Sequence, residues 1–543
     1  MKNRVKRGEH LVSYNLLTEP WITSIDLSGN PVQEGILATL KNAHKIDSIF
    51  DPAPPVEFGI YRLLIAFITD VFQPQGLEDL ADLLDRKRLD PTALDEYAAR
   101  WRDRFDLFDE KYPFLQQAIT GVIKKPPEPI SRLMQHLPAG TNVSHFHHGR
   151  WDENSFSFEQ CAKGLVTIAP FMTAGGAGLS PSINGSPPWY VLVKGNNLFE
   201  TLLYNVCQIP MTVKPIGDSP VAWRNDKRID PGDEPKTFSI VEGLTWRPRI
   251  IQLIPGNGKG TCTYTGEKDV DTVSHMHYYP GQKSPEPGLW VDPQVAYKKT
   301  KDAIRPLRPD ENKALWRDIG PLMLLQHGDY SGKDGKVSFD RPAVVTQYKQ
   351  MVSNGMIKRS EPLRLEVYGI RTDGKMKIYE WYHEKLALPI EILKKANSGR
   401  QIQDAMDLAD SVAYILRKAM KKAYPRNAKS NESGFDNLIL SVQSSYWSHL
   451  KGQFESIFLK TLSQQDENDL DAYTKLMEQW KKILDDTGKN ALDKGLGPLD
   501  TDGDSLRRQV KAMNEYSSGI RFALYPDSIQ AKKKNRQKNK EDK

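Results

Sequence analysis

Apolar residues recur every three or four positions through the last third of the chain, and this spacing constrains the fold more than any other feature. One stripe occupies residues 402–420, and similar stripes follow at 435–458, 473–484 and 506–516. A repeat of this period is typical of helices that bury one face against their neighbours. Because polar or glycine-containing connections separate the stripes, we predict a four-helix bundle over residues 388–528.

The preceding part of the chain lacks a single periodicity. A length of 543 residues exceeds what one hydrophobic core normally supports, so two or three domains are expected. Behind Pro54 and Pro55, apolar side chains at helical spacing continue to Phe72, which predicts an amphipathic helix. From about residue 190 to about residue 385, short strand-like runs alternate with proline- and glycine-rich turns. We therefore predict an α+β fold in which a large irregular mixed domain, residues 1–387, precedes the bundle.

Charge and cysteine content limit the cellular setting and the partners. Three cysteines in so long a chain argue against a disulfide framework, and no apolar run approaches the ~18 residues of a membrane span. Residues 1–10 are basic but lack the apolar core of a signal peptide, so we expect a soluble, cytoplasmic protein that contacts no membrane. A net charge of +6 is compatible with nucleic-acid binding by a local surface. Residues 529–543 predict a disordered basic tail, with a nucleic-acid-binding arm as the alternative.

A glycine- and proline-rich segment, TAGGAGLSPSINGSPP, occupies residues 173–188, between an apolar run and the strand-like WYVLV. Glycines at this density leave backbone N–H and C=O groups uncovered and allow another molecule to approach closely. Turn-rich loops are common, so the segment alone does not define a function. It predicts a loop with an accessible backbone.

Histidines are the strongest candidates for metal ligands. They lie in two groups about 130 residues apart, namely His145, His147 and His148, then His275 and His277. Zinc sites usually close with a second Cys or His pair at short spacing, which the sequence lacks. We therefore predict no metal, and a metal-dependent nuclease that combines these histidines with Asp269 or Asp271 stays open as the alternative.

The sequence contains no convincing catalytic apparatus. Residues 256–260, GNGKG, resemble a phosphate-binding loop but lack its Lys-Ser/Thr ending and an evident helix after it. The sequence also has no nucleophile elbow, HExxH motif or helicase signature. This absence favours a binding subunit without a cofactor over an enzyme.

Four segments keep a distinctive order ahead of the glycine-rich segment: YNLLTEPWI at 14–22, PPVEFGIYRLLIAFITDVF at 54–72, WRDRFDLFDEKYPFLQ at 101–116 and RLMQHLPAGTNVSHF at 132–146. In this order and at roughly these distances, they resemble the CasA family, the large subunit of type I-E CRISPR Cascade surveillance complexes. The resemblance is good from about residue 14 to about residue 205, patchier to about residue 390, and mostly topological beyond that. It also implies the C-terminal four-helix bundle.

The resemblance implies a set of DNA-binding elements. In the family, a glycine loop, a lysine finger and a wedge at a hairpin tip together recognise the protospacer-adjacent motif and start strand separation. The glycine loop then falls on Gly175, Gly176 and Gly178, and the lysine on Lys283. Backbone of this kind can enter the minor groove, and a lysine can reach the acceptor atoms displayed there.

The implied wedge lies on a candidate hairpin, residues 368–382, at Asp373, Gly374 and Lys375. The Asp-Gly pair predicts a two-residue turn at its tip. Relatives often place glutamine there, so a hairpin that only packs, or a phosphate contact by Lys375, stays open. Some relatives also carry paired cysteines, plausibly for zinc, near the equivalents of this chain's single ones, so no zinc is carried over.

A further loop, residues 145–158, matches the family segment that touches the 5′ end of the guide, and there Phe146 and Trp151 either stack on bases or pack. We therefore interpret the chain as a non-catalytic DNA-recognition subunit. Its expected partners are double-stranded target DNA, the guide-RNA-containing complex with its backbone and small subunits, and the nuclease-helicase that the bundle helps recruit. A scaffold without direct DNA contact is a third interpretation.

Overall fold

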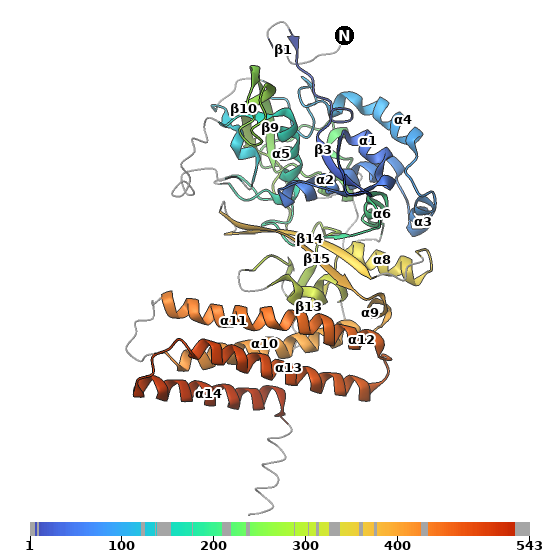
Figure 1. Ribbon diagram of the computed structural model, residues 1–543. Helices are drawn as coiled ribbons and strands as arrows, with labels where there is room; N and C mark the ends of the chain where they lie inside the picture. Colours follow the sequence, from blue (N-terminus) through green and yellow to red (C-terminus); the bar gives the residue numbers. More distant parts are fainter. Residues whose placement is uncertain are drawn as a thin grey trace, which may run out of the picture. The chain divides into compact units, whose positions relative to one another are not determined.

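The structure is a computed structural model, drawn as a ribbon in Figure 1. It describes residues 6–7, 10–120, 125–135, 137, 154–175, 178–208, 219–234, 239–286, 288–301, 303–310, 314–324, 337–357, 362–373, 377–424 and 433–526. The chain divides into two compact units. Unit 1 comprises residues 1–309, 321–326 and 331–387, and unit 2 comprises residues 310–320, 327–330 and 388–543.

Helix α2, Pro54–Phe72, is the core helix of unit 1 (Figure 1). Its prolines occupy the first turn, where an N–H would have no intrahelical partner, and Gln73 ends the helix in a left-handed conformation. The predicted helix is confirmed, although it is buried on nearly all sides rather than on one face. At Gly59 an added Cβ would lie 2.7 Å from the carbonyl oxygen of Val166, so this glycine allows close packing on α5, Phe158–Phe171.

The strands of unit 1 form small antiparallel sheets. One sheet, of order β15-β14-β8, holds the predicted hairpin and consists of β8 Tyr190–Val193, β14 Leu363–Thr372 and β15 Ile378–Leu388. In another, β10 Val270–Pro280 pairs with β9 Arg249–Gly260, β6 Glu128–Pro129 and β7 Phe156–Ser157. The remaining strands that the structure describes are β1 Lys6–Arg7, β2 His10–Leu11, β3 Ile22–Asp26, β4 Pro31–Glu34, β5 Ile46–Ile49, β11 Tyr297–Thr300, β12 Ile304–Pro306 and β13 Val337–Asp340.

Short helices complete unit 1, and side chains cap several of them. The first N–H groups of a helix lack intrahelical partners, so a polar side chain just before the helix fixes where it begins. The caps are Asp90 before α4, Asn197 before α6 and Ser239 before α7. The shorter helices of this unit are α1 Ile36–Lys41, α3 Leu77–Asp85, α4 Pro91–Trp101, α6 Leu198–Tyr204, α7 Ile240–Leu244 and α8 Ala343–Ser353.

Unit 2 is helical. The predicted stripes lie on its long helices, of which α10 packs against α11, α13 and α14 (Figure 1). The apolar stripe on α10 is buried from Ile402 to Met420, as its spacing predicts. The α+β class with a helical C-terminal region is therefore confirmed. The described helices of this unit are α9 Ile390–Lys394, α10 Ser398–Lys422, α11 Ser433–Gln453, α12 Lys460–Gln464, α13 Leu470–Leu496 and α14 Gly503–Leu524.

A short segment distant in sequence also belongs to the helical unit. Residues 310–320 cluster with it, and Trp316 is buried against the rings of Trp447 and Phe454 at centroid distances of 5.8 and 5.4 Å. The neighbouring Arg317 lies 3.8 Å above the ring of Trp447 and forms an ion pair with Asp410 on α10. The core of unit 2 therefore includes side chains from outside the predicted bundle range.

Removing the Arg317 side chain should destabilise unit 2 measurably. Arg317→Ala loses a close cation–π contact and a partly buried ion pair, for which about 1–2 kcal/mol is expected. Urea unfolding followed by tryptophan fluorescence measures the change. As a control, Lys418→Ala removes a more exposed ion pair with Glu515 and should cost less than about 1 kcal/mol. Equal effects of the two substitutions would contradict a structural role for this segment.

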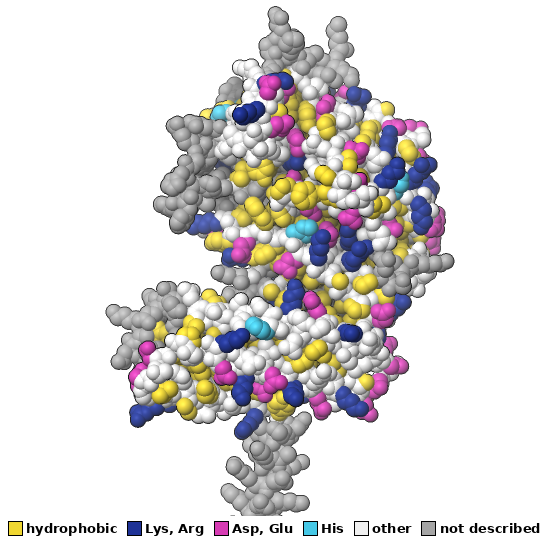
Figure 2. Space-filling model, in the orientation of Figure 1, with side chains coloured by type: hydrophobic (Ala, Val, Ile, Leu, Met, Phe, Trp, Pro, Cys, Tyr) yellow, Lys and Arg dark blue, Asp and Glu magenta, His cyan; other side chains and the backbone are white. Residues whose placement is uncertain are grey.

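The described surface mixes charges of both signs. Figure 2 shows lysine and arginine side chains interspersed with aspartate and glutamate on the face in view. Such mixing agrees with the small net charge of +6 and means that a nucleic-acid site depends on local geometry. Within the described residues, no helix combines the length and the apolar content needed to cross a membrane.

Candidate nucleic-acid interface

The glycine-rich segment leaves helix α5 and forms an open loop. Gly178 has φ +78°, a left-handed conformation that favours glycine, and an added Cβ there would meet nothing within 4 Å. At Gly175 an added Cβ would instead lie 3.1 Å from the Leu179 side chain. The loop is therefore packed at one glycine and open at another, whereas Gly176 lies outside the described residues.

A buried arginine holds both ends of this loop. The Arg249 guanidinium donates hydrogen bonds to the carbonyl oxygens of Thr173, at 2.8 Å, and Ser180. Its Nε donates to the Tyr278 hydroxyl at 2.8 Å, which fixes the plane of the guanidinium. Because one rigid fork binds the carbonyls on either side of the glycines, the width of the loop is set by a single side chain. Sequence reasoning missed Arg249, because no local motif marks it.

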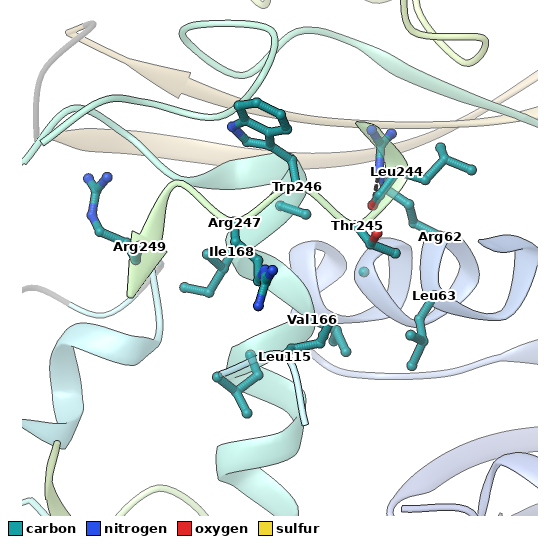
Figure 3. A pocket seen from close by; sticks show the side chains of 13 residues that line it. Arg62, Leu63, Leu115, Val166, Ile168, Leu244, Thr245, Trp246, Arg247 and Arg249 are labelled. Carbon is teal, nitrogen blue, oxygen red and sulfur yellow. Dashed lines mark hydrogen bonds between the residues drawn. The ribbon is translucent and has the colours of Figure 1, made fainter. Parts of the chain in front are cut away.

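The same arginine lines two pockets. In one cavity, Figure 3 shows Arg62, Arg247 and Arg249 projecting in different directions among apolar side chains of α2, α5 and the segment before β9. In the other, Arg249 lines a polar pocket with Thr173, Gly175, Arg132 and Tyr278. Arg132 stacks over the Tyr278 ring at 5.0 Å, so the base of the loop carries two guanidinium groups.

Burial makes one of the cavity's arginines easier to deprotonate. Desolvation lowers the pKa of Arg247 to about 10, and the nearby charge of Glu242 opposes this shift. The Arg247 side chain remains protonated at neutral pH all the same. Figure 3 also shows the hydrogen bonds that hold Arg62, which donates to the carbonyl oxygen of Leu244 at 3.1 Å. The cavity is thus lined by side chains that already bind the backbone around them.

Lys283 lies next to the glycine-rich segment. The hydroxyl oxygen of the following residue, Ser284, lies 3.0 and 2.8 Å from the carbonyl oxygens of Pro181 and Ser182, and its proton can be donated to either. The Lys283 ammonium is exposed and forms an ion pair with Glu234. An exposed pair of this kind contributes little to stability, so the lysine can exchange Glu234 for another anion at small cost. The structure thus brings together two of the elements that the family resemblance implies.

The predicted hairpin is present, but its turn is wider than expected. Strand β14 ends at Thr372 and strand β15 begins at Ile378, and the Asp373 N–H donates to the Lys377 carbonyl oxygen at 3.1 Å. The Asp373 carboxylate accepts the Lys377 N–H at 3.0 Å. The prediction of a two-residue Asp-Gly turn is therefore wrong, because Asp373 pairs with Lys377 and the loop between them is longer. Gly374 and Lys375, within that loop, lie outside the described residues.

The hairpin also packs against the end of the glycine-rich segment. Trp189, directly after that segment, contacts the ring of Tyr382 on β15 at a centroid distance of 5.2 Å. An added Cβ at Gly369 on β14 would lie 2.6 Å from the Trp189 ring, so this glycine makes room for it. The glycine-rich segment and the residue after it therefore contact both the stretch that carries Lys283 and the strands of the hairpin, the latter through the buried ring of Trp189.

A cluster that sequence reasoning missed joins the hairpin to helix α2. One potential ligand atom from each of Glu57, Glu366 and His383 lies within 4.8 Å of the other two. The Tyr368 hydroxyl lies 2.5 Å from a Glu57 oxygen and 2.9 Å from a Glu366 oxygen, and its single proton can serve only one of them. A proton held on Glu57 supplies the second hydrogen bond.

The pKa values of the two carboxyl groups move apart. Burial raises the pKa of Glu57 to about 7. Burial also raises the pKa of Glu366, but the contact with His383, whose Nε2 lies 3.4 Å from a Glu366 oxygen, and the charges of Lys194 and Lys385 prevail and lower that pKa to about 2. Two carboxylates and an imidazole are groups that bind divalent cations. Here the ammonium groups of Lys194 and Lys385 already act on the Glu366 carboxylate, so we assign the cluster a structural role.

This cluster predicts a pH dependence of stability. Because the pKa of Glu57 is about 7 in the folded protein and near 4.5 when unfolded, the folded state holds an extra proton between these values. Stability should therefore fall on the order of 1–3 kcal/mol as pH rises from about 4.5 to about 7. Glu57→Gln should flatten this decline, measured by urea unfolding at each pH. Glu366→Gln, whose carboxyl has the opposite shift, should lower stability most above about pH 4.5 and should flatten the loss of stability that occurs as pH falls from about 4.5 to about 2, and the reverse pattern would contradict the assignment.

The histidine set of the nuclease hypothesis is only partly described. His275 is exposed and His277 is buried on β10, where desolvation lowers the pKa of His277. Among the described residues, neither histidine gathers with Asp269 or Asp271 into a group of three potential ligands. Outside the described residues lie His145, His147 and His148, and also the predicted base-stacking residues Phe146 and Trp151.

The single cysteines are buried and unbridged. Cys161 on α5 and Cys262 after β9 are both free thiols. Burial raises the pKa of Cys161 well above its usual value, with a smaller contribution from Cys262. The Cys262 thiol therefore influences the Cys161 thiol although the two residues are far apart in the sequence.

Comparisons with known proteins define the family. The model of the family described as CRISPR-associated protein Cse1 (CRISPR_cse1) matches residues 15–491, most of the chain. The chain therefore belongs to the Cse1 family. A curated relative from Thermus thermophilus, described as CRISPR-associated protein CasA/Cse1, is 26% identical over 499 residues, which cover 87% of this chain and 92% of the relative.

Solved structures share the fold. Cse1 from Acidimicrobium ferrooxidans superposes with a TM-score of 0.72 at 18% identity, covering 95% of this chain and 99% of that one. Thermobifida fusca Cse1 gives a TM-score of 0.72 at 19% identity, covering 94% and 98%. A chain of a structure titled CRISPR RNA-guided surveillance complex gives 0.69 at 18% identity, covering 94% and 99%. The suspected resemblance to the CasA family is confirmed.

Proposed function

We propose that this chain is the large subunit of a CRISPR RNA-guided surveillance complex, in which it reads a short motif beside the target in duplex DNA and promotes strand opening there. Family membership supports the place in the complex, because a relative of the same fold is a chain of such a complex. Sequence specificity over the target itself would come from pairing with the guide RNA. The role is non-catalytic.

The observation that carries the proposal is that the glycine-rich segment contacts the stretch that carries Lys283, while Trp189 directly after it packs on the hairpin. Gly178 leaves the loop backbone open, Arg249 holds the loop ends, and Ser284 keeps Lys283 beside it. Backbone N–H groups and a lysine are donors, which suit the acceptor atoms of the minor groove. Opening of the adjacent base pair would then be the work of the hairpin tip around Asp373, at a cost of a few kcal/mol.

The partners follow from this role. Double-stranded DNA would contact unit 1, while the helical unit would bind neighbouring small subunits and help recruit the nuclease-helicase. The guide RNA and the backbone subunits would complete the complex. We place this assembly in the cytoplasm, since three unbridged cysteines suit a reducing compartment.

The proposal is tested by motif discrimination in the assembled complex. Lys283→Ala should weaken binding to correctly flanked duplex DNA by about 1–3 kcal/mol, because one charge-assisted contact is lost. Gly178→Asp should weaken it further by repelling the phosphates, whereas Gly178→Asn, which tolerates the left-handed conformation, should act less strongly. Electrophoretic mobility shifts with correct and altered flanking motifs measure both effects.

A neighbouring lysine supplies the control. Lys227 pairs with Asp233, next to the partner of Lys283, and is 75% exposed. Lys227→Ala should leave discrimination between flanking motifs unchanged. Unchanged discrimination in the Lys283 and Gly178 variants as well would remove the recognition role from these loops and leave the scaffold interpretation.

A further inference from the structure

Strand β15 carries a one-sided pattern of aromatic and basic residues. Successive side chains of a strand point to opposite faces, so the odd and the even positions separate. The odd positions bring together Lys377, Tyr379, Trp381, His383 and Lys385. The even positions are Ile378, Glu380, Tyr382, Glu384 and Leu386, so both acidic residues belong to the other set.

Two of the even positions make contacts within and beside the hairpin. Tyr382 packs on Trp189 and donates a hydrogen bond to Glu380. The Glu380 carboxylate also accepts from Arg371 Nε at 3.0 Å, so its charge is balanced within the hairpin. Tyr382 and Glu380 therefore help to hold the hairpin in place.

The odd positions leave two aromatic rings exposed. Tyr379 is 53% and Trp381 is 42% exposed, and the Arg371 guanidinium lies 4.7 Å above the Tyr379 ring. Only Leu27 and Phe50 are comparable large hydrophobic side chains in the described part of unit 1. Two exposed rings at neighbouring odd positions form a small apolar patch, and such patches can mark binding sites.

Charge along the strand narrows the kind of partner. Lys377 is exposed at the end next to the hairpin turn, and Arg371 lies over Tyr379. At the other end His383 and Lys385 meet the Glu366 carboxylate, so that end is neutralised. At the turn end Lys377 thus supplies a cation near the two rings, whereas Glu380 offsets the charge of Arg371, and aromatic rings beside a cation are a pattern that binds unpaired bases along a phosphate backbone.

We propose that Tyr379 and Trp381 form a stacking surface for unpaired bases of the DNA strand released beside the hairpin. This inference rests on the proposed function, which puts strand opening at the turn of the same hairpin. The turn would part the base pair, and the rings would then hold an exposed base and slow its return to the duplex. The rings read no sequence, because every base presents a face for stacking.

The first test uses the full-length protein and a single-stranded DNA oligonucleotide carrying 2-aminopurine. Stacking should quench the probe, and Tyr379→Ala with Trp381→Ala should restore its fluorescence and weaken binding about tenfold to a hundredfold. Tyr379→Phe with Trp381→Phe keeps the rings and should behave like the unchanged protein. Phe522→Ala, which removes an exposed ring of α14, should have no effect. Unchanged quenching and affinity in the double alanine variant would overturn the inference.

A second test separates this inference from the proposed function. In the assembled complex, the double alanine variant should keep its discrimination between flanking motifs but lose about tenfold or more in the rate of strand opening, followed by 2-aminopurine in the released strand. Normal opening together with normal discrimination would overturn the stacking surface and leave motif recognition intact. If the protein without substitutions does not discriminate between flanking motifs, the proposed function is contradicted instead. If the double alanine variant binds only single-stranded RNA more weakly, the rings bind RNA and the inference is overturned. The same holds if a protein subunit is lost from its complex, because the rings then bind that subunit.

Discussion

Replacing Arg249 with lysine is expected to remove most of the discrimination between flanking motifs while the chain stays folded. Lysine keeps the positive charge but has no planar fork, so it cannot bind the carbonyl oxygens of Thr173 and Ser180 together. The Tyr278 hydroxyl also loses a donor. Each buried polar group left without a partner costs about 1–3 kcal/mol of folding stability. Arg249→Lys should therefore lower the free energy of unfolding by about 2–4 kcal/mol.

The matched control changes the other arginine at the base of the loop. Arg132 lines the same pocket, but its ion pair is with Glu128, at 2.9 Å, and not with the glycine-rich segment. Arg132→Lys should therefore have a much smaller effect on discrimination, measured with the same correctly and incorrectly flanked duplexes. If Arg249→Lys and Arg132→Lys discriminate between flanking motifs equally well, the width of the glycine loop does not depend on Arg249.

The elements that sequence could predict are those whose signal is local. The period of apolar residues in α10 and the proline entry of α2 are determined by neighbours a few positions away. The alternation in β15 likewise predicts a strand. The prediction of a two-residue turn was nevertheless wrong, because the Asp373 carboxylate accepts the Lys377 N–H and the loop is longer than the Asp-Gly pair.

The parts that escaped prediction depend on contacts between distant positions. Arg249 meets Thr173, and Glu57 meets Glu366, through packing that no residue spacing encodes. Trp316 joins the helical unit for the same reason, since nothing around it repeats the period of the bundle. The family resemblance indicated the glycine loop and Lys283, whereas the side chains that hold them in place became visible only in three dimensions.

Arg62→Met should be the most destabilising single change in unit 1. Arg62 on α2 and Asp292 are 1% and 0% exposed, and they form an ion pair at 2.8 Å. Asp292 also accepts a hydrogen bond from the Asn184 side chain at 2.9 Å, so the pair ties the glycine-rich segment to the core helix. Methionine would leave the carboxylate buried without its cation, and breaking such a pair costs about 3–5 kcal/mol.

A second substitution shows whether the unpaired charge is the cause. Asp292→Asn in the Arg62→Met background removes the buried charge while keeping a polar side chain near Asn184, so part of the lost stability should return. The midpoint of urea unfolding and its slope, followed by tryptophan fluorescence, measure both variants. Recovery is expected because a buried pair often contributes little net stability, whereas one isolated buried charge is strongly unfavourable. A double variant less stable than Arg62→Met alone would mean that Asp292 stabilises the segment through Asn184 and not through the arginine.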